Sequence, residues 1–445
     1  MERIYLFILF FAISSQLSLA VDGYWEERFP DNPPPPRLGS LISPIGDNKV
    51  LLINGGGYND TWIYDYNANT WEEVLCSFTP KQNSGSKTLI QLSKNRAFYV
   101  GGSKYISDEE YICENWIFDL DSMKWFQLDV SVAPSARTVH GLAKLNDTSL
   151  ILFGGNAASF FPVRLKDTWR CTVTETSASS PYMINVNWNV LNDGKKDPNS
   201  PVYYGMVTDL VDLSEDTVMF FARVGDMDGY WDFKLFSGTT NKWSAIGIDS
   251  ITSDISELKE SKQYNAFGYC KLADNIILQF GGSDRNVQKN TNNTYLFIYT
   301  NKDNVINAYK INNNIEMPKV FSSTAARIND STALVFGGTL DSTDYSTYTY
   351  VAINRTFIFH LTDRTDPRNL GAIEEVGNEK ILTTLDNNIY QLSNIETAVL
   401  YDVMGNKISE YKHSEIINTN SLHTGIYILQ CLHNKKFKNI KIIKL

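Results

Sequence analysis

Two histidines, His140 and His360, are the side chains of residues 1–364 best suited to bind a metal or to transfer a proton. His140 closes the segment PSARTVH, whereas His360 lies inside the apolar run RTFIFHL. They fall at different points of the pattern around them, so we do not expect them to converge on one site. The sequence also has no HExxH pair, nucleophile elbow or phosphate-binding glycine loop. Both histidines are therefore predicted to be structural.

A calcium-loop pattern lies at residues 225–231, where GDMDGYW places two aspartates two residues apart before a glycine. The segment lacks a downstream acidic ligand at the spacing that a calcium loop needs, and Asp-Gly is also a common hairpin turn. The five cysteines are scattered without CxxC spacing, which indicates neither a zinc site nor a disulfide framework. One bridge in the large domain remains an alternative. We therefore predict no metal, no cofactor and no catalytic residue.

The composition favours a folded protein that is rich in β-strands. Charged residues make up 20% of the 445 residues and hydrophobic residues 43%, a balance typical of folded rather than disordered chains. Aromatic residues reach 13%, and clusters of Gly, Asn, Asp and Thr separate the apolar runs, which favours an all-β architecture. The formal charge of −10 argues against a nucleic-acid partner, which normally meets a basic surface.

Residues 1–20, MERIYLFILFFAISSQLSLA, have the organisation of a signal peptide. Arg3 precedes an apolar core over residues 4–13, and Ser18 and Ala20 supply the small side chains of a cleavage site. A membrane anchor is the alternative, but the apolar core is shorter than the roughly 20 residues that span a bilayer. We expect cleavage and export, with no transmembrane segment in the mature chain.

Six short apolar runs recur along residues 49–339, and five of them end in paired glycines. Each run has strand composition, and a glycine pair suits a close backbone approach or a positive φ at the strand end. The runs are KVLLINGGG (49–57), RAFYVGGS (96–103), SLILFGGN (149–156), TVMFFARVGD (217–226), NIILQFGGS (275–283) and TALVFGGT (332–339). The paired glycines are Gly55, Gly56, Gly101, Gly102, Gly154, Gly155, Gly281, Gly282, Gly337 and Gly338.

An aromatic-led strand follows each run, and a further strand with its own aromatic comes after it. The leading rings are Trp62, Trp116, Trp169, Trp231, Tyr295 and Phe357, and the later rings are Trp71, Trp125, Trp188, Trp243 and Tyr309. The sixth unit has no later ring after Phe357. The segment DGYWEERFPDNPPPPRLGS, residues 22–40, contains such a unit ending at Trp25 with no beginning ahead of it. We therefore predict that a strand around Trp25 pairs beside the strand around Phe357.

With these elements the sequence resembles the kelch family of β-propellers. The matching features are the paired glycines after an apolar strand, the aromatic-led strand and a tryptophan about nine residues later. The resemblance covers residues 21–364 and implies an all-β, six-bladed propeller, each blade a four-stranded antiparallel sheet beside a central channel. The strand around Trp25 would close the ring by completing the sixth blade. An all-β sandwich is the alternative fold.

The resemblance also implies a ligand-binding site at the mouth of the channel. In kelch proteins the arginine of a P-x-x-R corner before each innermost strand often faces that mouth. The matching residues are Arg37 and Arg137, and by alignment Lys87, Tyr204, Tyr264 and Phe321 occupy the same place. A ring that mixes cations and aromatics suits an acidic peptide or a carbohydrate. The alternative is that each arginine only braces its corner.

Some kelch propellers are enzymes, which leaves catalysis to be weighed. Copper radical oxidases of this architecture need His and Tyr ligands with a Cys beside one tyrosine, and His140 and His360 do not match that pattern. Sialic-acid mutarotases would place a carboxylate and an arginine in the channel, and spacing reveals no such pair. We therefore predict a module that binds an extracellular protein or a glycan. The alternative is a carbohydrate-active enzyme, a lyase or a mutarotase, that uses the channel mouth.

The last part of the chain, residues 370–445, has a different pattern of strands. Its features are LYDVMGNKI with a Gly-Asn turn, then SLHTGIYILQ, then a lysine-rich final strand ending in KIIKL. It resembles the C-terminal sorting domain of type IX secretion substrates in Gram-negative bacteria, although the usual Pro-Asn-Pro stretch is missing. The resemblance implies a small Ig-like β-sandwich, recognition by the secretion machinery, and a secreted or cell-surface location reached through the periplasm. A generic Ig-like binding module is the alternative.

Overall fold

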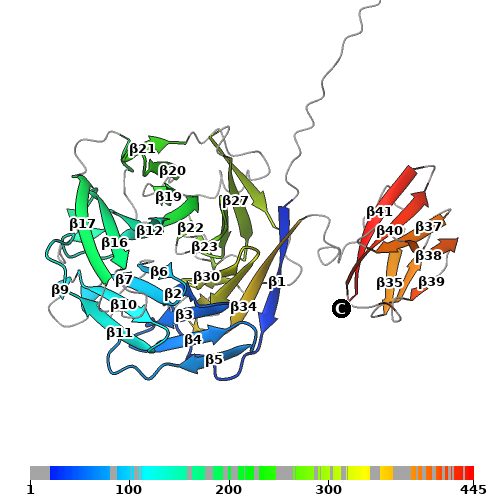
Figure 1. Cartoon of the computed structure of the whole chain (residues 1–445), viewed down its shortest axis with the longest axis horizontal. Coiled ribbons are helices and arrows are strands. Elements are labelled where there is room, and N and C mark those ends of the chain that lie inside the picture. The colour runs from blue at the N-terminus through cyan, green and yellow to red at the C-terminus, as the bar shows by residue number, and fades with distance from the viewer. Residues whose placement is uncertain are drawn as a thin grey trace, which may run out of the picture. The chain divides into compact units, whose positions relative to one another are not determined.

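The structure is a computed structural model, and within the residues that it describes every regular element is a β-strand (Figure 1). No helix in that part of the chain has the length and apolar character that crossing a bilayer would require. The structure describes residues 21–444 apart from 81–87, 102, 105–109, 112, 158–162, 176–183, 194–198, 202–208, 215, 225–229, 247–263, 266, 285–288, 291, 301–303, 312–316, 318, 341–350, 364–381, 387–388, 393–396, 403–406, 413–415, 419–421, 423–424 and 434–435.

The chain divides into two compact units, of which the larger is Gly23–Leu361. The larger unit contains six four-stranded sheets, numbered here 1 to 6. Sheet 1 consists of β2 (Leu41–Ile45), β3 (Lys49–Ile53), β4 (Thr61–Asp65) and β5 (Thr70–Glu73). Sheet 2 consists of β6 (Leu89–Ser93), β7 (Arg96–Val100), β10 (Asn115–Asp119) and β11 (Lys124–Leu128). Sheet 3 consists of β12 (Gly141–Asn146), β13 (Ser149–Phe153), β16 (Thr168–Glu175) and β17 (Ile184–Asn192).

The other three sheets repeat this order. Sheet 4 consists of β18 (Leu210–Ser214), β19 (Thr217–Val224), β20 (Tyr230–Ser237) and β21 (Lys242–Ala245). Sheet 5 consists of β23 (Gly268–Ala273), β24 (Ile276–Phe280), β27 (Thr294–Thr300) and β28 (Val305–Lys310). Sheet 6 consists of β30 (Thr324–Asn329), β31 (Thr332–Phe336), β34 (Thr356–Asp363) and β1 (Val21–Arg28). Figure 1 shows the sheets arranged about a common centre, which is the arrangement of a β-propeller.

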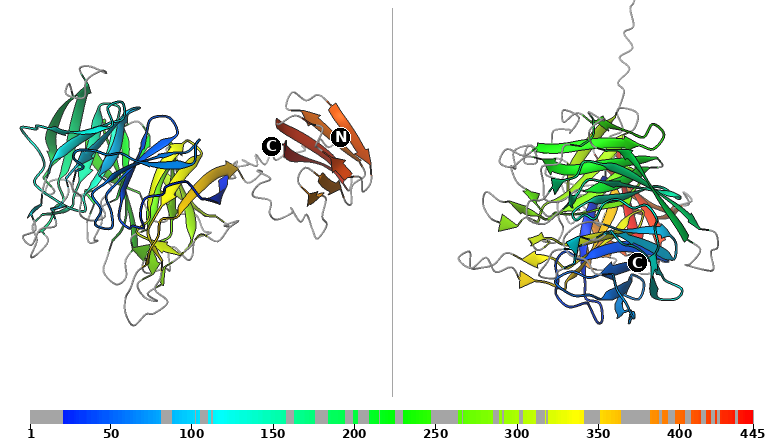
Figure 2. Two further views of the ribbon diagram at one scale, coloured as in Figure 1. Left: turned by 90° about the horizontal axis from the view of Figure 1, so that it is seen from below. Right: turned by 90° about the vertical axis from the view of Figure 1, so that its left-hand side faces the viewer.

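Sheet 6 is assembled from two distant parts of the sequence. Its fourth strand is β1, which comes from the start of the unit and is hydrogen-bonded to β34 near the end of the unit. Figures 1 and 2 both show the blue β1 beside the gold β34. The strand predicted around Trp25 therefore lies beside the strand that contains Phe357.

Consecutive residues of a strand point to opposite faces of its sheet, and neighbouring sheets cover both faces. The strands therefore form where several apolar residues follow one another. Buried residues of sheets 1 and 2 make one core cluster, and further clusters join sheets 2 and 3, sheets 3 and 4, sheets 4 and 5, and sheets 6 and 1. Sheets 5 and 6 meet through Trp25, whose ring packs against Phe280 and Phe359 with centroids 5.5 and 5.1 Å away. The first strands also follow one another in contact, from β2 through β6, β12, β18, β23 and β30 back to β2.

Short strands extend the connections between the second and third strands of several sheets, and in sheets 5 and 6 also the segments that precede the first strand. They are β8 (Ser103–Lys104) with β9 (Glu110–Tyr111), β14 (Asn156–Ala157) with β15 (Val163–Arg164), β22 (Tyr264–Asn265) with β25 (Ser283–Asp284) and β26 (Lys289–Asn290), and β29 (Val320–Phe321) with β32 (Thr339–Leu340) and β33 (Val351–Ala352). The turns between first and second strands are short by comparison, and several use a residue with positive φ, such as Asn48 at 54°.

The second unit contains two sheets that begin after Thr362. One sheet has the order β35 (Leu382–Asp386), β36 (Ile389–Leu392) and β39 (Ile416–Asn418). The other has the order β38 (Lys407–Lys412), β37 (Thr397–Asp402), β40 (Gly425–His433) and β41 (Lys436–Lys444). Both contain buried apolar side chains, for example Ile417 in the first and Leu400 and Leu429 in the second.

Candidate functional site

A cavity of about 200 Å³ lies between the first strands of the six sheets. Each of these strands contributes three consecutive residues to the cavity wall, which we call the channel. The six segments are 42–44 of β2, 89–91 of β6, 142–144 of β12, 210–212 of β18, 269–271 of β23 and 325–327 of β30. The channel is therefore built from equivalent positions of sheets that are far apart in the sequence.

The last residue of each segment belongs to what we call the polar ring. Its members are Pro44, Gln91, Lys144, Asp212, Lys271 and Arg327. In sheets 2 to 6 the pairing register of the first strand shifts directly after this residue. A β-bulge of this kind inserts one extra residue, increases the local twist and re-aims side chains. The repeated bulge thus gives the polar ring the same local geometry in five sheets.

Opposite charges meet within the polar ring and at the turns beside it. Nζ of Lys271 lies 2.8 Å from the carboxylate of Asp212 in the neighbouring sheet and 2.9 Å from that of Asp274. Lys144 pairs with Asp147 at 2.9 Å, and Arg327 pairs with Asp330 at 2.9 Å. Each ring cation is thus held by an aspartate three positions further along its own chain segment.

The cations are less exposed than the aspartates that hold them. The side chains of Lys271 and Lys144 are 18% and 28% exposed, whereas those of Asp274 and Asp147 are 76% and 94% exposed. Burial lowers the pKa of Lys271, but the adjacent Asp212 and Asp274 outweigh burial and raise it overall. Lys271 therefore stays charged, and an incoming anion would have to compete for it with the partly exposed Asp212 as well as with the exposed Asp274.

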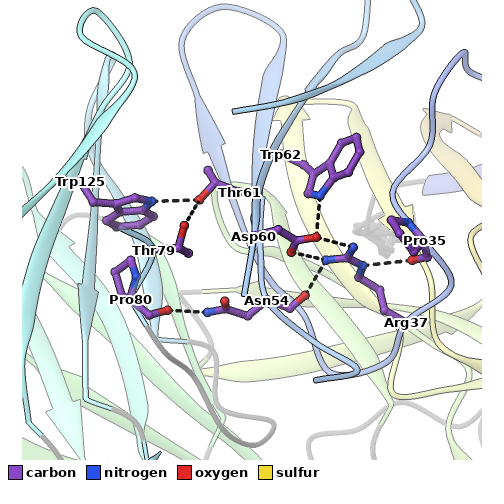
Figure 3. Close-up of polar contacts among 9 residues, drawn as sticks. All are labelled: Pro35, Arg37, Asn54, Asp60, Thr61, Trp62, Thr79, Pro80 and Trp125. Carbon is purple, nitrogen blue, oxygen red and sulfur yellow. Dashed lines mark hydrogen bonds and ion pairs between the residues drawn. The ribbon is translucent and has the colours of Figure 1, made fainter. Parts of the chain in front are cut away.

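Arg37, one of the residues predicted to bind ligand, is fully buried at its corner (Figure 3). Its guanidinium donates to both carboxylate oxygens of Asp60 at 2.6 and 2.7 Å, and also to the carbonyl oxygens of Asn54 and Pro35. Asp60 in turn accepts from the indole N–H of Trp62 at 2.8 Å. These contacts tie the corner before sheet 1 to the start of its third strand, which favours the bracing alternative.

Arg137 makes the same set of contacts in sheet 3. It is fully buried and donates to both carboxylate oxygens of Asp167 at 2.7 and 2.8 Å. Burial raises the pKa of Asp167, but hydrogen bonds from Arg137 and Trp169 outweigh burial and lower it overall. Two corners far apart in sequence are thus held by the same kind of buried arginine–aspartate pair. A direct role of either arginine in ligand binding stays a prediction.

Of the other four predicted ligand-binding residues, Phe321 alone has a described side chain, and it is not among the residues that line the channel. Phe321 lies in β29 and is half-buried, while Tyr264 lies in β22 with only its backbone described. Lys87 and Tyr204 lie outside the described residues. None of the four is part of the described polar ring.

The tryptophans that mark the repeats are buried and join neighbouring sheets. Trp25, Trp71, Trp125, Trp188 and Trp243 are at most 8% exposed. Each donates its indole N–H to a side chain at the start of the third strand in the preceding sheet. The acceptors are, in the same order, Thr294 at 3.0 Å, Thr356 at 3.3 Å, Thr61 at 3.0 Å, Asn115 at 2.9 Å and Thr168 at 2.9 Å.

The paired glycines meet the backbone of the corners. All nine that the structure describes have positive φ, and Gly102 lies outside the described residues. Gly337 illustrates the need, since its φ is 66° and a Cβ there would lie 2.6 Å from the carbonyl oxygen of Arg37. A side chain at this position would push sheet 6 away from the corner before sheet 1.

Neither histidine lies in the channel wall. His140 is buried, and a Cβ on Gly101 would touch its ring. Burial, together with the charge of Arg137, lowers the pKa of His140 to about 3, so this ring is neutral at physiological pH. His360 lies in β34, where it stacks on Tyr24 and its Nε2 lies 2.8 Å from the carboxylate of Glu26. These contacts lie within the fold, and the structural role of both histidines stays a prediction.

Metal ligands do not cluster in the described part of the chain, where no three His, Cys, Asp or Glu side chains are placed to hold an ion. Residues 225–229 of the calcium-loop pattern lie outside the described residues. The cysteines form no disulfide, and Cys171, Cys270 and Cys431 are buried.

Sequence reasoning missed the polar ring, although a signal for it exists. The ends of four first strands share one pattern. A charged residue is followed by an aliphatic residue and a small or polar one, and an acidic residue comes directly after the strand. These segments are KLND (144–147), DLSE (212–215), KLAD (271–274) and RIND (327–330). The charge at the first position was not recognised because the paired glycines and tryptophans dominate the repeat.

Comparison with known proteins places this architecture in context. Residues 22–180 match the model of the KLHDC2/KLHL20/DRC7 Kelch-repeats domain. Adagio-like protein 3 of Oryza sativa subsp. japonica is 28% identical over 170 residues, which are 33% of this chain and 27% of that protein. Acyl-CoA-binding domain-containing protein 4 of Arabidopsis thaliana is 25% identical over 166 residues, 33% of this chain and 24% of that protein. The matched part therefore spans about a quarter of the length of these relatives.

Among solved structures, one titled "Structure of YjhT" aligns with a TM-score of 0.43 and 15% identity, covering 62% of this chain and 84% of that one. A fungal alcohol oxidase in complex with copper aligns with a TM-score of 0.43 and 9% identity, covering 91% of this chain and 85% of that one. The paired glycines, the buried corner arginines and the match over residues 22–180 all point to the same family. Residues 22–180 are therefore similar to a kelch-repeats domain.

Proposed function

We propose that this protein is an exported binding module whose channel takes an extracellular protein or glycan ligand. The polar ring is the observation that carries the proposal, because Lys144, Lys271 and Arg327 converge there on one cavity of about 200 Å³. Partly buried cations need a partner, and here the partners are mostly exposed aspartates that a ligand can replace. Kelch propellers are protein-binding folds, which supports the same reading.

The propeller is proposed to be a closed ring of six blades, with β1 as the strand that completes the last blade. The cyclic contacts of the first strands support this reading, and so do the indole hydrogen bonds that link each sheet to the one before it. A closed ring leaves no sheet edge open for pairing with other chains. It also fixes the distances across the channel, which keeps the ring cations preorganised.

An enzyme acting on a sugar is the second candidate function. Asp212 favours it, because this carboxylate lies in the channel beside Lys271 and Arg327 also lines the wall. A carboxylate next to cations is a plausible acid–base group for a ring-opening or elimination reaction. The binding module is preferred because Asp212 is tied to Lys271 at 2.8 Å.

The test screens the full-length protein against panels of extracellular proteins and of glycans, and follows binding and turnover in the same samples. Binding without turnover is expected, and it should weaken in Arg327→Gln but not in Lys49→Gln, a lysine on β3 away from the channel. Turnover that disappears in Asp212→Asn would replace the binding module by the enzyme. A screen in which no protein or glycan binds would remove the proposal.

Export is proposed to use residues 1–20 as signal peptide and residues 370–445 as type IX sorting domain. The support is the sequence pattern of both segments, together with the lysine-rich strand β41 at the end of the chain. Removing residues 370–445 should leave the propeller in the cell envelope, which fractionation and surface labelling would reveal. Undiminished surface delivery of the truncated chain would refute the sorting role without affecting the proposed binding at the channel.

A further inference from the structure

A groove of about 910 Å³ runs beside the channel mouth between sheets 2 and 3. One wall is the end of β6 with its turn, residues 91–94, and the other is the turn after β12 together with Thr172, Val173 and Thr174 of β16. The groove opens on the side where the first and second strands turn. This is not the position of the corner arginines, which precede the first strands.

The groove and the channel share two wall residues, Gln91 and Lys144. Both belong to the polar ring, so a ligand that leaves the channel on this side enters the groove directly. Lys144 sits at the junction, where its Nζ donates to the carbonyl oxygen of Leu92 at 3.2 Å and lies 2.9 Å from Asp147. Its contact to Leu92 holds the ammonium group between sheets 2 and 3. The two spaces therefore adjoin at Gln91 and Lys144, with the ammonium group of Lys144 at their boundary.

The groove wall carries the polar groups of a site for a hydroxylated chain. Ser93, Thr148, Thr172 and Thr174 contribute hydroxyls, and Gln91 contributes an amide. The apolar members Leu92 and Val173 are buried in the core, so they offer no pocket for an apolar side chain of a peptide. Hydroxyls and amides can both donate and accept hydrogen bonds, which suits the hydroxyl groups of a sugar.

The charges along the path favour a ligand with carboxylates. Lys94 and Lys144 lie in the groove wall with Asp147, and Lys271 and Arg327 line the channel with Asp212, so the described walls carry four cations and two carboxylates. Lys94 also pairs with Asp47, which lies outside both walls. The described residues of the groove wall include no aromatic ring on which a neutral sugar could stack. Recognition would therefore depend on ion pairs with the ligand.

We infer that groove and channel form one binding site for a carboxylated polysaccharide, with one carboxylate of the chain on Lys144 at the junction. This inference rests on the proposed binding function and specifies its ligand class and path. A chain that occupies both spaces gains from each sugar unit, so longer oligosaccharides bind more tightly than single sugar acids. Added salt weakens the ion pairs, and esterification of the carboxylates removes them.

Calorimetry on the full-length protein with polygalacturonate oligomers of increasing length tests the inference. Affinity is expected to rise with length, to fall when the same oligomers are methyl-esterified, and to drop about tenfold in Lys144→Met. The matched control is Lys124→Met on the exposed outer strand β11, which should stay within about twofold of the unchanged protein. Thermal unfolding of each variant shows whether the fold is kept.

A second variant covers the case in which Lys144→Met does not fold. Thr174→Glu adds a negative charge to the exposed groove wall and should weaken binding, whereas Thr239→Glu in the turn between β20 and β21 should not. Equal affinity for free and esterified oligomers, or no binding of the acidic oligomers, would overturn the inference.

Poly-glutamate serves as the peptide probe. If it binds as tightly as polygalacturonate with the same loss in Lys144→Met, the ligand is an acidic peptide and the glycan inference is overturned while the binding function stands. If the broad panels give no ligand at all, the binding function itself fails.

Discussion

An arginine–carboxylate pair braces both the corner before sheet 1 and the junction of sheet 6, where β1 pairs with β34. The positions of the arginine and the carboxylate are exchanged between the two places. At the corner, the buried Arg37 pairs with Asp60, which stands two residues before the aromatic Trp62. In sheet 6 the position two residues before the aromatic Phe357 holds Arg355, and its partner is Glu27 of β1 at 2.6 and 2.7 Å. In sheet 6 the arginine thus directly precedes the third strand, and the carboxylate lies on β1, the strand that pairs with it.

The difference follows from where the strands come from. In sheets 1 and 3 the corner ion pair braces a chain that continues from strand to strand, and the arginines are fully buried. In sheet 6 the outer strand β1 has no covalent turn to β34, and the pair that helps to hold it is partly exposed, 38% for Arg355 and 23% for Glu27. The exposed pair contributes little, so the burial of Trp25 has to provide most of the attachment.

Removal of the Trp25 ring should have the largest effect on stability. Trp25→Ala is expected to lower the free energy of unfolding by about 4–5 kcal/mol, because it removes a buried ring, its contacts to Phe280 and Phe359 and its hydrogen bond to Thr294. Trp125→Ala in the continuous sheet 2 is the matched control and should cost less, since a turn keeps β11 in place. Urea unfolding followed by circular dichroism measures both, and equal losses would contradict the distinction between the two kinds of sheet.

Breaking the buried corner should rank second. Arg37→Met leaves Asp60 without its charged partner in a largely buried place, and the expected loss is about 3–4 kcal/mol. The same measurement applies, with Arg28→Met as a control of similar size at a partly exposed pair. A loss below that of the control would show that the corner contributes little to the fold.

The pH dependence of stability separates the buried corners from the junction of sheet 6, and at the corner of sheet 3 the titrating group is His140. The pKa of His140 falls from its ordinary value of 6.5 to about 3 in the folded state, so below pH 6.5 the unfolded chain binds a proton that the folded chain does not. Stability should therefore decrease as the pH falls, by roughly 2 kcal/mol between pH 7 and pH 5. His140→Gln should remove this slope in unfolding experiments at several pH values.

At the junction of sheet 6, stability depends on pH in a lower pH range. Burial raises the pKa of Glu26, but hydrogen bonds from Arg28 and His360 outweigh burial and lower the pKa below its ordinary 4.5. Its contribution is present above that value and is lost as the pH falls through the lowered pKa. A slope between pH 5 and pH 6.5 that persists in His140→Gln would show that another group titrates there.

The exposed ion pair should give the smallest effect. Arg355→Met is expected to cost about 1 kcal/mol, because both partners are partly in contact with water. Glu27→Gln should cost a similar amount, and the double variant should cost little more than either. A loss as large as that of Arg37→Met would mean that the junction depends on charge rather than on Trp25.

Much of the fold was open to prediction because its signals repeat. The tryptophans and paired glycines marked the third and fourth strands and the corners, and the lone unit ending at Trp25 indicated a strand beside Phe357. The kelch resemblance is confirmed over residues 22–180. The site was harder to predict, since the arginines that matched the family pattern are taken up by Asp60 and Asp167.

The sequence by itself predicted the repeating order of the long strands in the larger unit, since the period of apolar and aromatic residues is a local property of the chain. It also determined that one strand is displaced to the start of the unit. Only the tertiary structure decided the partner of each charged group. Lys144, Asp212 and Lys271 become neighbours because bulged strands from three sheets meet at one channel. Arg37 is buried at the corner before sheet 1, where it pairs with Asp60, the residue before β4. Contacts of this kind depend on register and twist between distant segments, which no local pattern records.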